Sequence, residues 1–180
     1  MKSYCLCGAI LMAAMGGRAA DLTVCLETRA LVNHFMIERA KLVTVKIFSD
    51  AGLRIEWGTR ARCANDPRAI YVEIDTDGPA RYEAGVLAYA LPYGELGARI
   101  HVFYERVTKY HGERTAPLVL GHVMAHEIGH VLEGVVRHSE RGLMKAMWTA
   151  RDYFEMENTL RFAPEDVTLL QLGLKTRAAR

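Results

Sequence analysis

The 180-residue sequence predicts an α+β domain, in which a mixed β-sheet is packed by a long N-terminal helix, a second helix late in the chain and a C-terminal helix. Two observations predict this order. Apolar residues recur at helical spacing near the N-terminus and again beyond residue 116. Between these regions lie short runs rich in β-branched and aromatic residues, separated by turn formers. Hydrophobic residues make up 51% of the chain, a proportion typical of one globular domain.

The first 20 residues have the pattern of a signal peptide and are set apart from the fold. Lys2 gives a positive start, an apolar stretch runs from Tyr4 to Met15, and small residues offer a cleavage site near Ala19 or Ala20. The apolar stretch is too short for a stop-transfer helix. We therefore expect a secreted or periplasmic protein with a single domain over residues 21–180. A buried N-terminal element and a retained membrane anchor are the alternatives.

Charge and cysteine content restrict the partners and the environment of this domain. Without Lys2 and Arg18, the 23 basic residues of the chain fall to 21, equal to its 21 acidic residues. This balance argues against nucleic acid or an anionic membrane as a partner held by bulk electrostatics. Cys25 and Cys63 remain after signal removal, and an even pair in an exported protein predicts a disulfide. Two unpaired buried thiols are the alternative.

The first predicted helix spans Glu27 to Ala51. No proline interrupts it, and Gly52 supplies a C-terminal stop. The apolar residues at helical spacing are Leu31, Phe35, Leu42, Val45, Ile47 and Phe48. The four runs that follow are predicted strands: Leu53 to Trp57, Ala69 to Asp75, Gly85 to Leu91 and Ile100 to Val107.

Two further helices complete the predicted order. The first begins near Pro117, whose fixed φ suits a first helical turn, and ends near Gly134. The second begins at Pro164, where two acidic residues follow at the positive end of the helix, and ends near Gly173.

The helix from Pro117 carries a motif with the spacing of a metal site. His126 and His130 are four residues apart, so both imidazoles leave nearly the same helical face and can bind one ion. Glu127 is rotated by about 100° from His126, which allows its carboxylate to face a metal-bound water. Zinc lowers the pKa of such a water toward ~7, and a neighbouring carboxylate can take its proton. The segment therefore predicts a zinc site with Glu127 as general base.

A catalytic zinc needs a third protein ligand, and His138 is the first candidate. It follows Gly134, which tolerates the positive φ that lets a chain leave a helix and turn back. Glu140, Glu155 and Glu157 are alternatives, because carboxylates also bind zinc. His122 lies one turn before His126 on the same face, as a supporting or alternative ligand.

The segment from His126 to Ser139, with Gly142-Leu143-Met144 after it, resembles the metzincin metallopeptidases and within them the matrixin-like branch. That family shows H-E-x-x-H-x-x-G-x-x-H followed by a methionine turn beneath the metal. Here the glycine comes one residue later and the third histidine two residues later. The resemblance implies His126, His130 and His138 as zinc ligands and Glu127 as base. It implies Met144 as the turn methionine, with Met147 as a competitor.

These features together predict a secreted zinc metalloendopeptidase that hydrolyses a peptide or protein substrate, with Zn²⁺ as its cofactor. The resemblance further implies that a strand edge binds the substrate in extended form, at Gly85 to Leu91 or at Ile100 to Val107. The alternatives are a metzincin-like zinc-binding module without peptidase activity and a zinc hydrolase of a non-peptide amide or ester. The module is disfavoured because a structural zinc site does not need Glu127.

Overall fold

The computed structural model describes residues 20–83, 85–94, 97–112 and 114–179. The predicted signal peptide, apart from residue 20, lies outside this part of the chain. No helix among the described residues is long and apolar enough to cross a membrane. The elements, in order, are β1 (Leu22–Thr28), α1 (His34–Asp50), β2 (Ile55–Trp57), α2 (Arg60–Asn65), β3 (Ile70–Asp75), β4 (Ala88–Gly94), β5 (Gly97–Phe103), α3 (Tyr104–Tyr110), α4 (Ala116–Glu133), α5 (Ala150–Glu155), the 3₁₀ turn η1 (Met156–Asn158) and α6 (Pro164–Ala178).

The five strands form one mixed sheet in the order β2-β1-β3-β5-β4. All neighbouring pairs are parallel except β4, which runs antiparallel to β5 and occupies one edge. The α+β class with a mixed sheet is therefore confirmed. Successive residues of a strand face opposite sides, and on β3 Ile70, Val72 and Ile74 are fully buried on the side that carries the core.

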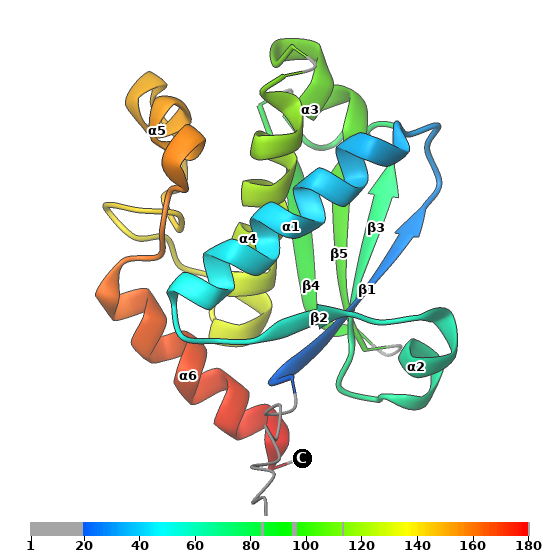
Figure 1. Cartoon of the computed structure of the whole chain (residues 1–180), viewed down its shortest axis with the longest axis vertical. Helices are drawn as coiled ribbons and strands as arrows, with labels where there is room; N and C mark the ends of the chain where they lie inside the picture. The colour runs from blue at the N-terminus through cyan, green and yellow to red at the C-terminus, as the bar shows by residue number, and fades with distance from the viewer. Residues whose placement is uncertain (1–19, 84, 95–96, 113, 180) are drawn as a thin grey trace, which may run out of the picture.

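Helices α1 and α4 cover this apolar face of the sheet, and α6 packs on α4 (Figure 1). Glycines allow both helix crossings to be close. A Cβ added at Gly121 of α4 would lie 2.7 Å from the Ala40 carbonyl oxygen of α1. A Cβ added at Gly173 of α6 would lie 1.8 Å from the Leu132 carbonyl oxygen of α4. Helix α4 is thus fixed between the sheet, α1 and α6.

The opposite face of the sheet carries the disulfide and a set of polar side chains. Cys25 of β1 and Cys63 of α2 are joined by the predicted disulfide. Tyr71 lies beside this pair, and its hydroxyl donates to the Cys63 carbonyl oxygen at 2.9 Å. The disulfide therefore attaches α2 to the central part of the sheet.

The prediction of one helix from Glu27 to Ala51 is wrong in its first part. Residues 22–28 form β1, and α1 begins only after Asn33, whose side chain caps it by accepting from the Phe35 amide at 3.0 Å. Three residues of the predicted apolar face, Leu31, Phe35 and Leu42, are exposed. Ile47 and Phe48 of the predicted face are buried, and Met36, Ile37, Ala40 and Thr44 complete the buried side of α1.

Several other boundaries also differ from the predictions. The strand predicted over Ile100 to Val107 ends at Phe103, and Val107 lies in α3. The short helices α2, α3 and α5 were not predicted. Helix α6 continues past Gly173 to Ala178, because that glycine serves the contact with α4 and not a helix end.

Candidate metal centre

Helix α4 holds the H-E-x-x-H motif in a buried and well-fixed position. Most of its residues are buried, including His126 and Glu127. The helix ends at Gly134, whose φ of 66° is left-handed and turns the chain away from the helix axis. This turn leads into an irregular segment that returns toward the helix and carries His138.

The side chains of His126, His130 and His138 converge. Each offers one ligand nitrogen, and the three nitrogens lie within 4.8 Å of one another. The Nε2 atoms of His126 and His130 are 3.0 Å apart. Two nitrogens bound to one tetrahedral zinc at about 2.0–2.1 Å would be separated by ~3.3 Å. The three histidines therefore fit a metal ion.

His126 is oriented by a hydrogen bond of the kind that supports metal ligands. Its Nδ1 donates to the Leu143 carbonyl oxygen at 2.9 Å, which leaves the lone pair on Nε2, the atom that faces His130. The same carbonyl accepts from Nε1 of Trp148 at 3.0 Å, and the Trp148 ring meets the His126 ring edge to face at 5.7 Å. No local sequence signal indicated that Leu143 and Trp148 support the motif.

The site favours neutral imidazoles, which are the ligating form. Burial lowers the pKa of His126 to about 4 and that of His130 to about 3, and burial also lowers the pKa of the more exposed His138. Burial raises the pKa of the Glu127 carboxyl to about 8 in the absence of an ion. A divalent cation nearby favours the ionised carboxylate. A bound ion would therefore bring Glu127 into the form that can accept a proton.

Met144 lies buried beneath this site. Its Sδ is 2.8 Å from the position of a Cβ added at Gly129, so a larger residue at that position would displace the Met144 side chain. Met147 is 82% exposed and does not take this place.

The other predicted ligands do not join the group. Glu140, Glu155 and Glu157 are absent from the metal-type clusters found among the described residues. His122 is fully buried, and both of its ring nitrogens have partners: Nδ1 donates to the Leu118 carbonyl oxygen at 2.7 Å and Nε2 accepts from the Leu160 amide at 3.1 Å. It fixes the segment before α6 to α4 and has no nitrogen free for an ion.

A second cluster of metal-type side chains lies on the opposite face of the sheet, where Glu73 and Asp75 of β3 meet His101 of β5. Both oxygens of Glu73 pair with guanidinium groups, one with Arg29 at 2.6 Å and the other with Arg99. His101 Nδ1 lies 2.7 Å from Asp75. Two positive charges already neutralise this cluster, so it is an ion-pair network and does not fit a cation.

No known family model matches this sequence, and no curated protein is similar to it.

Proposed function

We propose that this protein is a zinc-dependent peptidase in which His126, His130 and His138 bind the metal and Glu127 is the general base. One observation carries the proposal: the imidazoles of His126 and His130 on α4 converge with that of His138 beyond the helix, and the buried Glu127 follows His126 on α4. Three protein ligands leave a fourth position for water or substrate, as in catalytic zinc sites, whereas structural sites fill it with a fourth side chain. The resemblance of the motif to metzincins and the disulfide are consistent with a secreted peptidase.

Each residue of the site has a defined task in hydrolysis. Bound zinc would supply Lewis-acid chemistry, acidifying water and polarising the substrate carbonyl. Glu127 takes a proton from the attacking water and passes it to the leaving amine. Burial desolvates this carboxylate and raises its pKa, which makes the ionised form a stronger base than one in water. The Leu143 carbonyl holds His126 in the tautomer that binds metal.

The sheet offers one edge near the site for an extended substrate. The sequence left two strands open, but β5 is paired on both sides, with β3 and with β4. Strand β4 lies at the edge and packs against α4. The Tyr93 hydroxyl donates to the Gly134 carbonyl oxygen at 2.8 Å and so joins β4 to the end of α4. We therefore place the substrate along β4, adding a strand to the sheet.

The surface around the site indicates the kind of side chain that a substrate presents there. Val136, in the turn between α4 and His138, is 96% exposed. Met147, next to Trp148, is also largely exposed. Exposed apolar residues beside a binding site contribute affinity by burial on binding. Peptides with apolar side chains next to the scissile bond are therefore the expected substrates.

The test measures zinc content and peptide cleavage for the protein without its first 20 residues and for Glu127→Gln. We expect stoichiometric zinc in both and a loss of ~10²–10⁴-fold in cleavage rate in the variant. Glu157→Gln, which changes an exposed glutamate in η1, is the matched control and should cleave like the parent.

Four outcomes would contradict the proposal. A parent without zinc would remove the metal site, and unchanged cleavage by Glu127→Gln would remove the general base. Zinc without cleavage of any peptide would favour a binding module, and cleavage of only small esters or amides would favour a non-peptide hydrolase.

A further inference from the structure

His138 differs from the other two histidines in how it is held. His126 and His130 are fixed by α4, whereas His138 is exposed and lies in an irregular segment between α4 and α5. A metal ligand in such a segment needs supporting contacts, since loose ligands weaken metal binding. One backbone hydrogen bond closes the segment after His138, from the Ser139 amide to the Met144 carbonyl oxygen at 2.8 Å.

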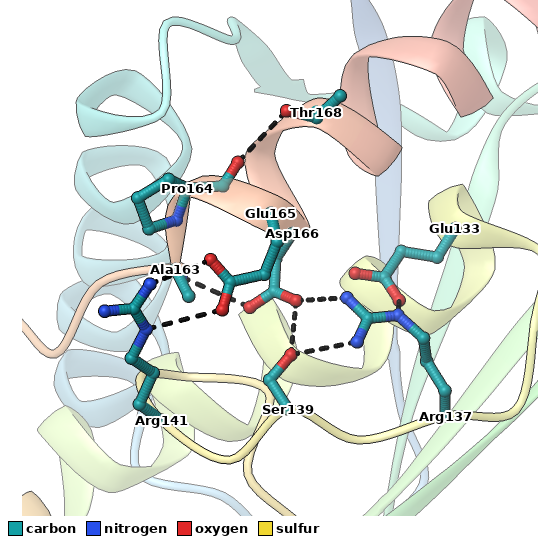
Figure 2. Close-up of polar contacts among 9 residues, drawn as sticks. All are labelled: Glu133, Arg137, Ser139, Arg141, Ala163, Pro164, Glu165, Asp166 and Thr168. Atoms are coloured by element: carbon teal, nitrogen blue, oxygen red, sulfur yellow. Dashed lines mark hydrogen bonds and ion pairs between the residues drawn. The ribbon is translucent and has the colours of Figure 1, made fainter.

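The residues on both sides of His138 are bound by a single carboxylate. Oδ1 of Asp166 accepts from the Arg137 guanidinium and from the Ser139 hydroxyl, and the guanidinium also donates to that hydroxyl at 3.1 Å (Figure 2). Arg137 extends the network to the end of α4, where its Nε lies 3.3 Å from Glu133. Asp166 itself is fully buried in the first turn of α6.

Asp166 is attached to a rigid part of the fold. Its second oxygen accepts from the Ala163 amide at 3.2 Å and caps α6. A carboxylate in the first turn of a helix is stabilised by the helix dipole. Helix α6 is in turn packed on α4 at the close crossing of Gly173 and Leu132. Contacts made by Asp166 therefore fix the segment around His138 relative to the helix that carries the other two histidines.

We infer that Asp166 is a positioning residue for the metal centre, holding His138 in ligating position through Arg137 and Ser139. This inference rests on the proposed metal-binding role of His138. A purely structural role, as a cap of α6, would affect folding alone. The positioning role adds a specific effect on metal binding that passes through His138.

The experiment is a double-mutant cycle on zinc affinity in the protein without its first 20 residues. Zinc affinity is measured by competition with a chromophoric chelator for the parent, Asp166→Ala, His138→Ala and the double variant. We expect Asp166→Ala to weaken binding by ~10–100-fold in the parent, as loss of a supporting contact does. In the His138→Ala background the same substitution should have almost no effect, since the ligand that it positions is gone.

Two matched variants separate positioning from general destabilisation. Asp166→Asn keeps the side-chain volume and one acceptor oxygen but loses the charge facing Arg137, and should weaken zinc binding to a smaller extent. Glu165→Gln changes the exposed neighbour in the same helical turn, which pairs with Arg141 at 3.2 Å, and should bind zinc like the parent. The absorption spectrum of bound Co²⁺ should change with Asp166→Ala and not with Glu165→Gln. Thermal unfolding in chelator shows which variants are folded.

The outcomes distinguish this inference from the proposed function. An equal loss of affinity in both backgrounds, or parental affinity in both Asp166 variants, would overturn the positioning role while leaving the zinc site in place. A parent that binds no zinc would overturn the proposed function together with this inference.

Discussion

Acidification should destabilise the metal-free protein through His122. This residue is fully buried and uses both ring nitrogens as a neutral imidazole, donating to Leu118 and accepting from the Leu160 amide. Protonation would place a second N–H against that amide and a charge in the interior. Burial accordingly lowers the pKa of His122 to about 4.

The magnitude follows from the difference between folded and unfolded pKa values. An unfolded histidine has a pKa of about 6.5. Between this value and about 4 the unfolded state binds more protons than the folded state, so the free energy of unfolding falls as the pH falls. Above about pH 7 the effect of His122 is absent. At pH 4 His122 lowers the free energy of unfolding by about 3 kcal/mol, a large fraction of the stability of a typical domain.

The assay is urea unfolding from pH 8 to pH 4 in the presence of chelator, for the parent and His122→Gln. Burial raises the pKa of Glu127 to about 8 and that of Glu133 to about 7, so these groups act in the opposite direction. The readout is therefore the difference between parent and variant, which should change by about 3 kcal/mol over this range. An equal pH dependence in the two proteins, or a His122 pKa near 6.5 by NMR, would refute the reasoning.

Three further predictions concern packing, covalent stabilisation and metal removal. Gly173→Ala places a Cβ 1.8 Å from the Leu132 carbonyl oxygen and should lower the free energy of unfolding by about 1–3 kcal/mol in urea. Gly85→Ala, which meets nothing within 4 Å, is its control, and equal stability of the two variants would contradict the packing argument. Cys63→Ser opens a disulfide whose cysteines are 38 residues apart and should reduce stability by about 4 kcal/mol. The folded fraction of Cys63→Ser should bind zinc with the affinity of the parent, because the disulfide lies on the sheet face opposite α4. Loss of zinc binding by that folded fraction would contradict this prediction. Zinc at a hundred times its dissociation constant should stabilise the protein by about 2.7 kcal/mol over the chelated form in calorimetry, and an unchanged melting temperature would argue against a specific site.

The parts of the site that lie close together in sequence could be predicted from it. The four-residue spacing of His126 and His130 places both on one side of any helix, and Gly134 marks where that helix ends. The helix itself was also predictable, because its apolar residues extend over many turns and Pro117 suits its start. Cys25 and Cys63 were predictable as a pair because the chain offered no other partner after signal removal.

The spacing of apolar residues along the chain was misleading where the burial of a side chain depends on which other helices or strands pack against its own. Leu31, Phe35 and Leu42 are apolar and spaced as on a helix, but they are exposed. Strand β1 was not predicted, and its last two residues, Glu27 and Thr28, were assigned to the first helix, because a run of only seven residues carries too little periodicity to identify a strand. Its pairing with β2 and β3, which are distant in sequence, makes it a strand.

The sequence by itself determined the local chemistry of this protein: a helix with two histidines and a glutamate on it, a histidine within reach after a glycine, and a pair of cysteines. Only the tertiary structure decided what surrounds that chemistry. Asp166 lies 28 residues beyond His138, and β4 becomes an edge strand only because β5 pairs with β3 on its other side. The physical reason is that spacing fixes the relative directions of side chains within a helix, whereas contacts between distant segments depend on how every element packs.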